Sequence, residues 1–220
     1  MIKCCIFDLD GTLLETLITI RHYVNQTLAV FGVEPITEEE CRVFVGNGAR
    51  NLIHRVLESR GVDTPEFFDK VFARYNAAYD AAPYHLTYPY DGINELLDRL
   101  TAAGIKLAVL SNKPDFATRV AINHFFGDRF DIVRGGTEGI ALKPAPDAPL
   151  ALLADLGCTA DDAAYVGDSE VDVICAANYK PALPIFVDWG FRTREELVAA
   201  GAVTVVSSTE DVARLILENK

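Results

Sequence analysis

The sequence has no run of basic residues and no apolar stretch of the length that crosses a membrane. Its 32 acidic residues outnumber its 20 lysines and arginines, and the formal net charge is -12. This balance argues against nucleic acid and against a membrane surface as partners. A small anionic substrate would also meet a weakly repulsive field, so its binding requires a local cluster of cations or amide groups.

The sequence has few cysteines. There are five, which is an odd number, and they do not have the spacing of a zinc site. Cys4 and Cys5 are adjacent within an apolar run, where we expect them to fill space as small apolar side chains. This usage suggests the reducing cytoplasm. The first apolar run is short and meets Asp8 at once, so a signal peptide is not expected.

Half of the residues are hydrophobic, which is enough for a sizeable core. From about Asp91 onward, helical patterns alternate with short apolar runs, which is typical of a parallel sheet with helices on both faces. We therefore predict an α/β protein with a Rossmann-like core. The predicted strands are residues 2–7, 106–110, 130–133, 163–166, 184–187 and 203–206.

Residues 17–87 do not follow this alternation and look helical throughout. Thr37 to Glu40 has the pattern of a helix start, and Thr64-Pro65 places proline at a first helical position. We predict an all-helical cap over residues 17–87, inserted after the first strand, with residues 1–16 and 88–220 forming the core. Such an insertion would cover the carboxyl edge of the first strand, where a lid is useful.

The most informative segment is Asp8-Leu9-Asp10-Gly11-Thr12, which directly follows the first apolar run. A buried strand that ends in two acids places them at the sheet edge where α/β proteins bind ligands. Two carboxylates this close repel each other unless a cation or a shared proton intervenes, and Mg²⁺ combines readily with carboxylates and substrate phosphate. The simpler alternative is a strand followed by an acidic turn.

Three further loops carry chemically useful residues: Ser111-Asn112-Lys113, the segment from Lys143 to Pro146, and the segment from Gly167 to Asp172. Taken singly, they are an ordinary turn, a solvated lysine and an acidic helix cap. Together they supply acids, phosphate-binding donors and a cation at loops near strand ends. Coincidence is then the weaker explanation.

These four segments resemble the motifs of the haloacid dehalogenase superfamily, D-x-D-G-T, S/T-N, K-P-x-P and G-D-S-x-x-D. Within the predicted insertion, Asn25, Leu28 and Gly32 match the N-x-x-L-x-x-x-G pattern of the phosphoglycolate-phosphatase-like group. Val45 to Gly48 matches the V-G-x-G pattern of the same group. The resemblance covers essentially the whole chain.

The resemblance implies a role for each motif residue. Asp8 would be the nucleophile that becomes an aspartyl phosphate, and Asp10 would be the general acid and then the general base. Mg²⁺ would be held by Asp8, the backbone carbonyl of Asp10 and Asp168. Ser111, the backbone of Asn112 and Lys143 would bind the phosphoryl oxygens. The supporting residues would be Asp172, which orients Lys143 or a bound water, and Thr12.

The resemblance further implies hydrolysis of a small phosphorylated metabolite, with 2-phosphoglycolate as the leading substrate. A phosphosugar mutase like β-phosphoglucomutase, a pyrophosphatase or a nucleotidase would use the same site. A non-catalytic receiver that accepts phosphate is a less favoured alternative, because receivers are shorter and have no cap. The oligomeric state, monomer or homodimer, stays open.

Two basic residues near the site receive separate predictions. Arg50 follows Gly46-Asn47-Gly48 in the insertion, where a solvated helix charge is the default interpretation, and Arg50 is the candidate in the insertion for contact with a carboxylate of the substrate. Lys113 is expected to be a charge on the rim of the site. With strand 163–166 on one side of residues 2–7 and strand 106–110 on the other, Asp8, Ser111 and Asp168 would meet at the switch point of the sheet.

Overall fold

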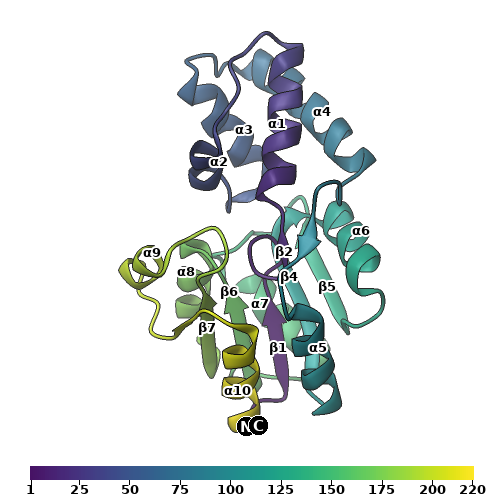
Figure 1. Ribbon diagram of the computed structural model, residues 1–220, viewed down its shortest axis with the longest axis vertical. Helices are drawn as coiled ribbons and strands as arrows, with labels where there is room; N and C mark the ends of the chain where they lie inside the picture. The colour runs from purple at the N-terminus through teal and green to yellow at the C-terminus, as the bar shows by residue number, and fades with distance from the viewer.

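The computed structural model describes every residue from Met1 to Lys220 and contains a six-stranded parallel sheet (Figure 1). The strand order is β5-β4-β1-β6-β7-β8, which confirms the predicted α/β class and the predicted neighbours of the first strand. The strands are β1 (Cys4–Phe7), β4 (Lys106–Pro114), β5 (Ile132–Gly136), β6 (Ala163–Gly167), β7 (Leu183–Val187) and β8 (Val205–Val206).

Strand β1 is buried on both faces because helices cover the sheet from both sides. Cys5 and Phe7 face a core built with α5, α6 and α10, whereas Cys4 and Ile6 face a core built with α7, α8 and α9. All five cysteines are buried and free, as expected of small apolar fillers. The helices are α5 (Ile93–Ala102), α6 (Asp115–Phe126), α7 (Asp147–Leu156), the short 3₁₀ helix η1 (Ala160–Asp162), α8 (Glu170–Tyr179), α9 (Arg194–Ala199) and α10 (Thr209–Glu218).

The segment between the first two long strands forms four helices that lie together above the sheet in Figure 1. They share a core of their own, in which Val24, Val56 and Val71 are fully buried. Thr37 makes a capping box with Glu40, and the Thr64 hydroxyl accepts a hydrogen bond from the Phe67 amide, as the sequence predicts. The helices are α1 (Leu17–Val30), α2 (Glu38–Phe44), α3 (Gly48–Ser59) and α4 (Pro65–Ala81).

Three features at the ends of elements differ from the sequence predictions. A two-stranded antiparallel ribbon, β2 (Leu14–Glu15) with β3 (Tyr88–Pro89), stands where the helical segment leaves and re-enters the core. Helix α4 ends at Ala81, so the helical pattern does not continue to residue 87. The third strand of the prediction, 130–133, lies at Ile132–Gly136.

Strand register determines which loops meet at the carboxyl edge of the sheet. Phe7 is aligned with Val109 on one side and with Val166 on the other, so Asp8 emerges between the carboxyl-terminal ends of β4 and β6. The pairing of β4 with β5 is irregular between Leu110 and Pro114. An irregularity of this kind turns side chains away from the regular alternation of a strand, and here it falls on residues 111–113. None of the helices combines the length and the apolar character that crossing a membrane requires.

Candidate active site

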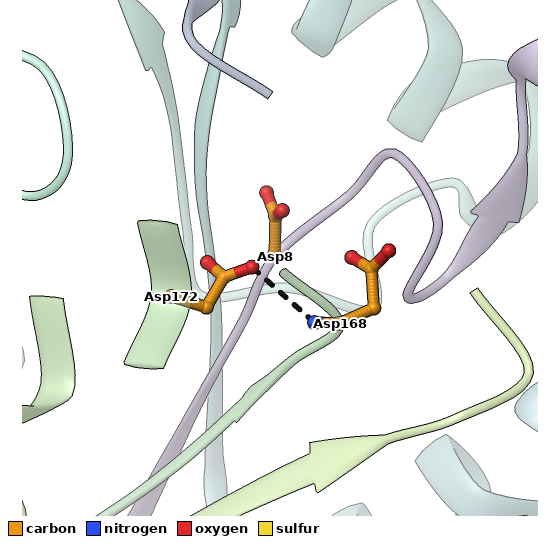
Figure 2. Close-up of side chains that lie close together, drawn as sticks. All are labelled: Asp8, Asp168 and Asp172. Carbon is orange, nitrogen blue, oxygen red and sulfur yellow. Dashed lines mark hydrogen bonds between the residues drawn. The ribbon is translucent and has the colours of Figure 1, made fainter. Parts of the chain in front are cut away.

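Three carboxylates meet where β1 and β6 end and α8 begins (Figure 2). Oxygens of Asp8, Asp168 and Asp172 all lie within 4.8 Å of one another. Asp168 and Asp172 are fully buried, and Asp8 is 8% exposed. The structure thus brings together acids that are 164 residues apart in the sequence, as the predicted switch point requires.

Asp172 is saturated with hydrogen bonds. Its Oδ1 accepts from Lys143 Nζ at 2.8 Å and from the Tyr165 hydroxyl at 2.5 Å. Its Oδ2 accepts from the amides of Asp168 and Ser169 at 3.2 and 3.1 Å, and from Ser169 Oγ at 2.6 Å. Burial alone would raise its pKa, but Lys143 and these donors hold the pKa of Asp172 below its usual value. Asp172 is therefore placed to anchor Lys143 rather than to bind a ligand.

Asp8 and Asp168 carry unbalanced negative charge. Burial raises the pKa of Asp8 to about 7, an effect that Lys143 partly offsets. Burial, Asp172 and Asp8 raise the pKa of Asp168 well above its usual value. Oδ1 of Asp8 is buried, and its only polar partner is the ammonium of Lys143, whose Nζ lies 2.8 Å away.

Three buried carboxylates around one ammonium leave an excess of negative charge, which fits a divalent cation bound beside Asp8 and Asp168. The donor set consists of oxygens, which suits a hard cation such as Mg²⁺ or Ca²⁺. Thr12 Oγ1 donates to Asp168 Oδ1 at 2.9 Å, and the Phe191 amide donates to Oδ2 at 2.7 Å. These contacts hold Asp168 in one orientation toward Asp8.

Glycine is required beside Asp168. Gly11 has φ +86°, and a Cβ there would stand 2.2 Å from Asp168 Oδ2. A Cβ on Gly190 would stand 2.3 Å from the Gly11 carbonyl oxygen and 2.5 Å from Asp168 Oδ2. The backbone therefore closes around this carboxylate at a distance that only glycine permits.

The irregular end of β4 supplies Ser111 and Asn112, which are both buried and line the same cavity as Asp8. The Asn112 side chain donates to the Lys143 carbonyl at 2.9 Å and accepts from the Lys143 amide at 2.8 Å. It also donates to the Gly46 carbonyl of the helical segment at 3.1 Å. Asn112 thus ties the Lys143 loop to the core, leaving phosphate contacts to backbone groups and to Ser111.

Lys143 is almost completely buried, and its ammonium stands between two acids. Burial would lower its pKa, but Asp172 and Asp8 raise the pKa of Lys143 above its usual value. The lysine therefore stays charged beside Asp8. A solvated lysine, the simpler interpretation of the sequence, does not describe it.

Lys113 is not on the rim, so that prediction is wrong. Its side chain is 5% exposed, and Nζ donates to Asp10 Oδ1 at 2.9 Å and to the Tyr79 hydroxyl at 2.6 Å. Sequence reasoning missed both Lys113 and Tyr79. The available signal for Lys113 was its position directly after Asn112, whereas nothing local in the sequence marks Tyr79 of α4.

Arg50 lies away from the acids. Its guanidinium is over the rings of Phe68 and Phe72, at 4.6 and 5.4 Å from their centroids. The side chain is exposed, and Arg50 does not line the cavity that contains Asp8 and Asp10. The geometry therefore gives no support to a contact between Arg50 and substrate.

A cavity of about 70 Å³ lies between the helical segment and the core, at the carboxyl end of β1. Core residues Asp8, Asp10 and Ser111 line one side. Helices α3 and α4 supply the opposite side, including Tyr75 and Tyr79. The acids of the first motif are thus covered by the helical segment.

This combination of a doubly wound sheet, a helical segment over its carboxyl edge, and buried acids beside a lysine defines a Rossmann-like enzyme with a covered site. The family model described as haloacid dehalogenase-like hydrolase matches residues 5–181. The chain belongs to this family.

Relatives and solved structures agree with that assignment. The chain is 40% identical over 190 residues to a phosphoglycolate phosphatase of Cereibacter sphaeroides, covering 85% of both chains. It is 35% identical over 212 residues to one of Rhodospirillum rubrum, covering 93% of this chain and 87% of the relative. The crystal structure of CbbY from Rhodobacter sphaeroides with phosphate superposes with a TM-score of 0.81 at 27% identity, covering 96% of each chain. The protein is therefore a phosphoric monoester hydrolase of the phosphoglycolate-phosphatase-like group.

Proposed function

We propose that the protein hydrolyses 2-phosphoglycolate through an aspartyl phosphate on Asp8, in a reaction that requires Mg²⁺. One observation carries the proposal: Asp8 Oδ1 is buried, and its only polar partner is the Lys143 ammonium at 2.8 Å. A carboxylate oxygen with free lone pairs beside a fixed cation is suited to attack phosphorus. The names of the relatives supply the substrate.

In the first step, a carboxylate oxygen of Asp8 bonds to phosphorus and the bond from phosphorus to the leaving oxygen breaks. Asp10 donates a proton to that oxygen, which leaves as the hydroxyl of glycolate. In the second step, Asp10 removes a proton from a water molecule as the water attacks phosphorus. The phosphoryl bond to Asp8 then breaks and releases phosphate.

Positioning and charge neutralisation supply most of the catalysis in phosphoryl transfer. Lys143, Ser111 and the Asn112 backbone would bind the phosphoryl oxygens, and Asp172 keeps Lys143 in place through its 2.8 Å contact. Asp8, Asp168 and the Asp10 carbonyl would hold Mg²⁺, while Thr12 orients Asp168. When bound, the ion reduces the repulsion between the Asp8 carboxylate and the phosphate dianion.

We further propose that residues 17–87 act as a cap on the core formed by 1–16 and 88–220. The Asn112 contact with Gly46 and the Lys113 contact with Tyr79 join the two parts at the site. A cap that closes during the first step would keep water from competing with Asp8. Opening would then admit water for the second step.

The test is a phosphate-release assay over a panel of phosphomonoesters with Mg²⁺. We expect 2-phosphoglycolate to have the highest kcat/KM, and a chelator to end its hydrolysis reversibly. Ca²⁺ should restore little activity, because its larger, looser coordination favours bidentate binding by Asp8 and blocks attack. Mg²⁺ should also raise the melting temperature, since it relieves repulsion among the buried carboxylates.

Three results would count against the proposal. Equal rates with Mg²⁺ and Ca²⁺, or full activity in chelator, would contradict the metal requirement. Conversion of a sugar phosphate to its isomer without phosphate release would instead favour the mutase alternative.

A further inference from the structure

Lys113 is the one basic residue that lines the cavity between the helical segment and the core. The nearby arginines are engaged elsewhere. Arg42 donates to the carbonyls of Gly190 and Phe191, and Arg55 donates to the carbonyl of Phe44. Arg50 is exposed over two phenylalanine rings. If a substrate carries a second negative group besides its phosphate, Lys113 is therefore the cation in this cavity that can pair with it.

The Lys113 ammonium retains a hydrogen-bond donor. It has three N–H groups, of which one is used by Asp10 Oδ1 at 2.9 Å and one by the Tyr79 hydroxyl at 2.6 Å. Its Nζ also lies 4.6 Å from the centroid of the Tyr79 ring. A buried cation is costly unless it is paired and fully hydrogen-bonded, so the remaining donor favours an anionic acceptor.

The charges around the cavity explain why such a cation is needed. Asp8, Asp10, Asp80 and Asp168 all line the cavity and are acidic. Lys143 is already paired with Asp8 and Asp172, where it would face the phosphoryl group. A carboxylate elsewhere on the substrate would meet net repulsion from the acids unless Lys113 offset it.

The contact with Asp10 also puts Lys113 within reach of such a carboxylate. If Asp10 protonates the leaving oxygen, that oxygen lies beside the Asp10 carboxyl, and Lys113 Nζ lies 2.9 Å from Asp10 Oδ1. In 2-phosphoglycolate a single methylene separates the leaving oxygen from the carboxylate carbon. Tyr75 and Tyr79 of α4 line the cavity on the opposite side, and this favours short substrates over long ones.

We infer that Lys113 binds the carboxylate of the substrate and thereby selects phosphomonoesters that carry an anionic group one carbon from the ester oxygen. The inference rests on the proposed function and adds the residue that determines selectivity. Tyr79 belongs to the helical segment and holds Lys113 in position. Lys113 is therefore correctly placed to bind the carboxylate only when that segment lies against the core. Arg50, which the sequence pattern favoured for this role, is replaced by Lys113.

The experiment compares 2-phosphoglycolate with ethyl phosphate, in which a methyl group replaces the carboxylate. Lys113→Met keeps an unbranched side chain as far as Cε and removes the ammonium group. We expect the ratio of kcat/KM values, phosphoglycolate over ethyl phosphate, to fall roughly ten- to hundred-fold, the usual size of a lost hydrogen bond to a charged group. Loss of the Asp10 contact lowers both values alike and leaves the ratio unaffected.

Arg50→Ala is the matched control, because it removes a cation of the helical segment that lies outside the cavity, and it should leave the ratio unchanged. If Lys113→Met does not fold, Lys113→Gln makes the same comparison with a neutral side chain that keeps an N–H donor. An unchanged ratio in the Lys113 variant that folds would overturn the inference. So would a selective loss in Arg50→Ala.

The wild-type enzyme separates failure of this inference from failure of the proposed function. Hydrolysis of ethyl phosphate as efficient as that of phosphoglycolate contradicts selection of the carboxylate, by Lys113 or by any other residue, but leaves phosphoryl transfer through Asp8 intact. No phosphate release from phosphoglycolate, ethyl phosphate or p-nitrophenyl phosphate overturns the proposed function and the inference with it.

Discussion

Asp8→Asn is expected to abolish phosphate release from 2-phosphoglycolate, because an amide cannot attack phosphorus or form an aspartyl phosphate. The fold should survive the change. Burial raises the pKa of Asp8 to about 7, so its charged form is already disfavoured, and a neutral amide of the same size removes repulsion from Asp168 and Asp172. The measurement is phosphate release with Mg²⁺, beside circular dichroism and a thermal melt.

Asp98→Asn serves as the control for this variant. Asp98 is a surface carboxylate of α5, 65% exposed and paired with Arg129 at 3.2 Å, so its loss should leave turnover near the wild-type value. Turnover by folded Asp8→Asn at more than a few per cent of wild type would remove Asp8 from the role of nucleophile.

Asp10→Asn is expected to lower kcat roughly 10²- to 10⁴-fold, the usual contribution of a general acid and base. The amide oxygen can still accept the hydrogen bond from Lys113 Nζ, which is 2.9 Å long in the native site. The change therefore removes proton transfer while keeping the local contacts. Rate measurements with phosphoglycolate give the size of the loss.

The choice of substrate separates the two roles of Asp10. The leaving group of p-nitrophenyl phosphate needs little protonation, so Asp10→Asn should release a burst of p-nitrophenol equal to the enzyme concentration. Slow turnover should follow, because no base then activates water for the second step. A near-wild-type steady rate on both substrates would contradict the acid-base assignment.

The sheet and its edge could be predicted from local patterns because each signal is contained in a short segment. Apolar runs such as Lys106 to Leu110 are strands in most contexts when helical patterns separate them. The acids at Asp8 and Asp168 follow directly from such runs. Asp8 and Asp168 then lie close together because the carboxyl ends of parallel strands all lie at the same edge of the sheet.

Contacts between the helical segment and the core could not be predicted in this way. Lys113 and Tyr79 are 34 residues apart in the sequence, and their hydrogen bond depends on how α4 packs over the irregular end of β4. Arg50 looked well placed because it follows two glycines, but its guanidinium packs on Phe68 and Phe72 instead. The ribbon of β2 and β3 has two residues in each strand, too few for an alternating pattern.

The central claim is that phosphate passes through Asp8, and chemical trapping tests it most directly. Wild-type enzyme is mixed with 2-phosphoglycolate and Mg²⁺, quenched during turnover, and treated with borohydride, which reduces an acyl phosphate to an alcohol. Mass spectrometry of the N-terminal peptide should find homoserine in place of Asp8, and none without substrate. Turnover that leaves Asp8 unmodified, or places the modification at another carboxylate, would contradict the proposed mechanism.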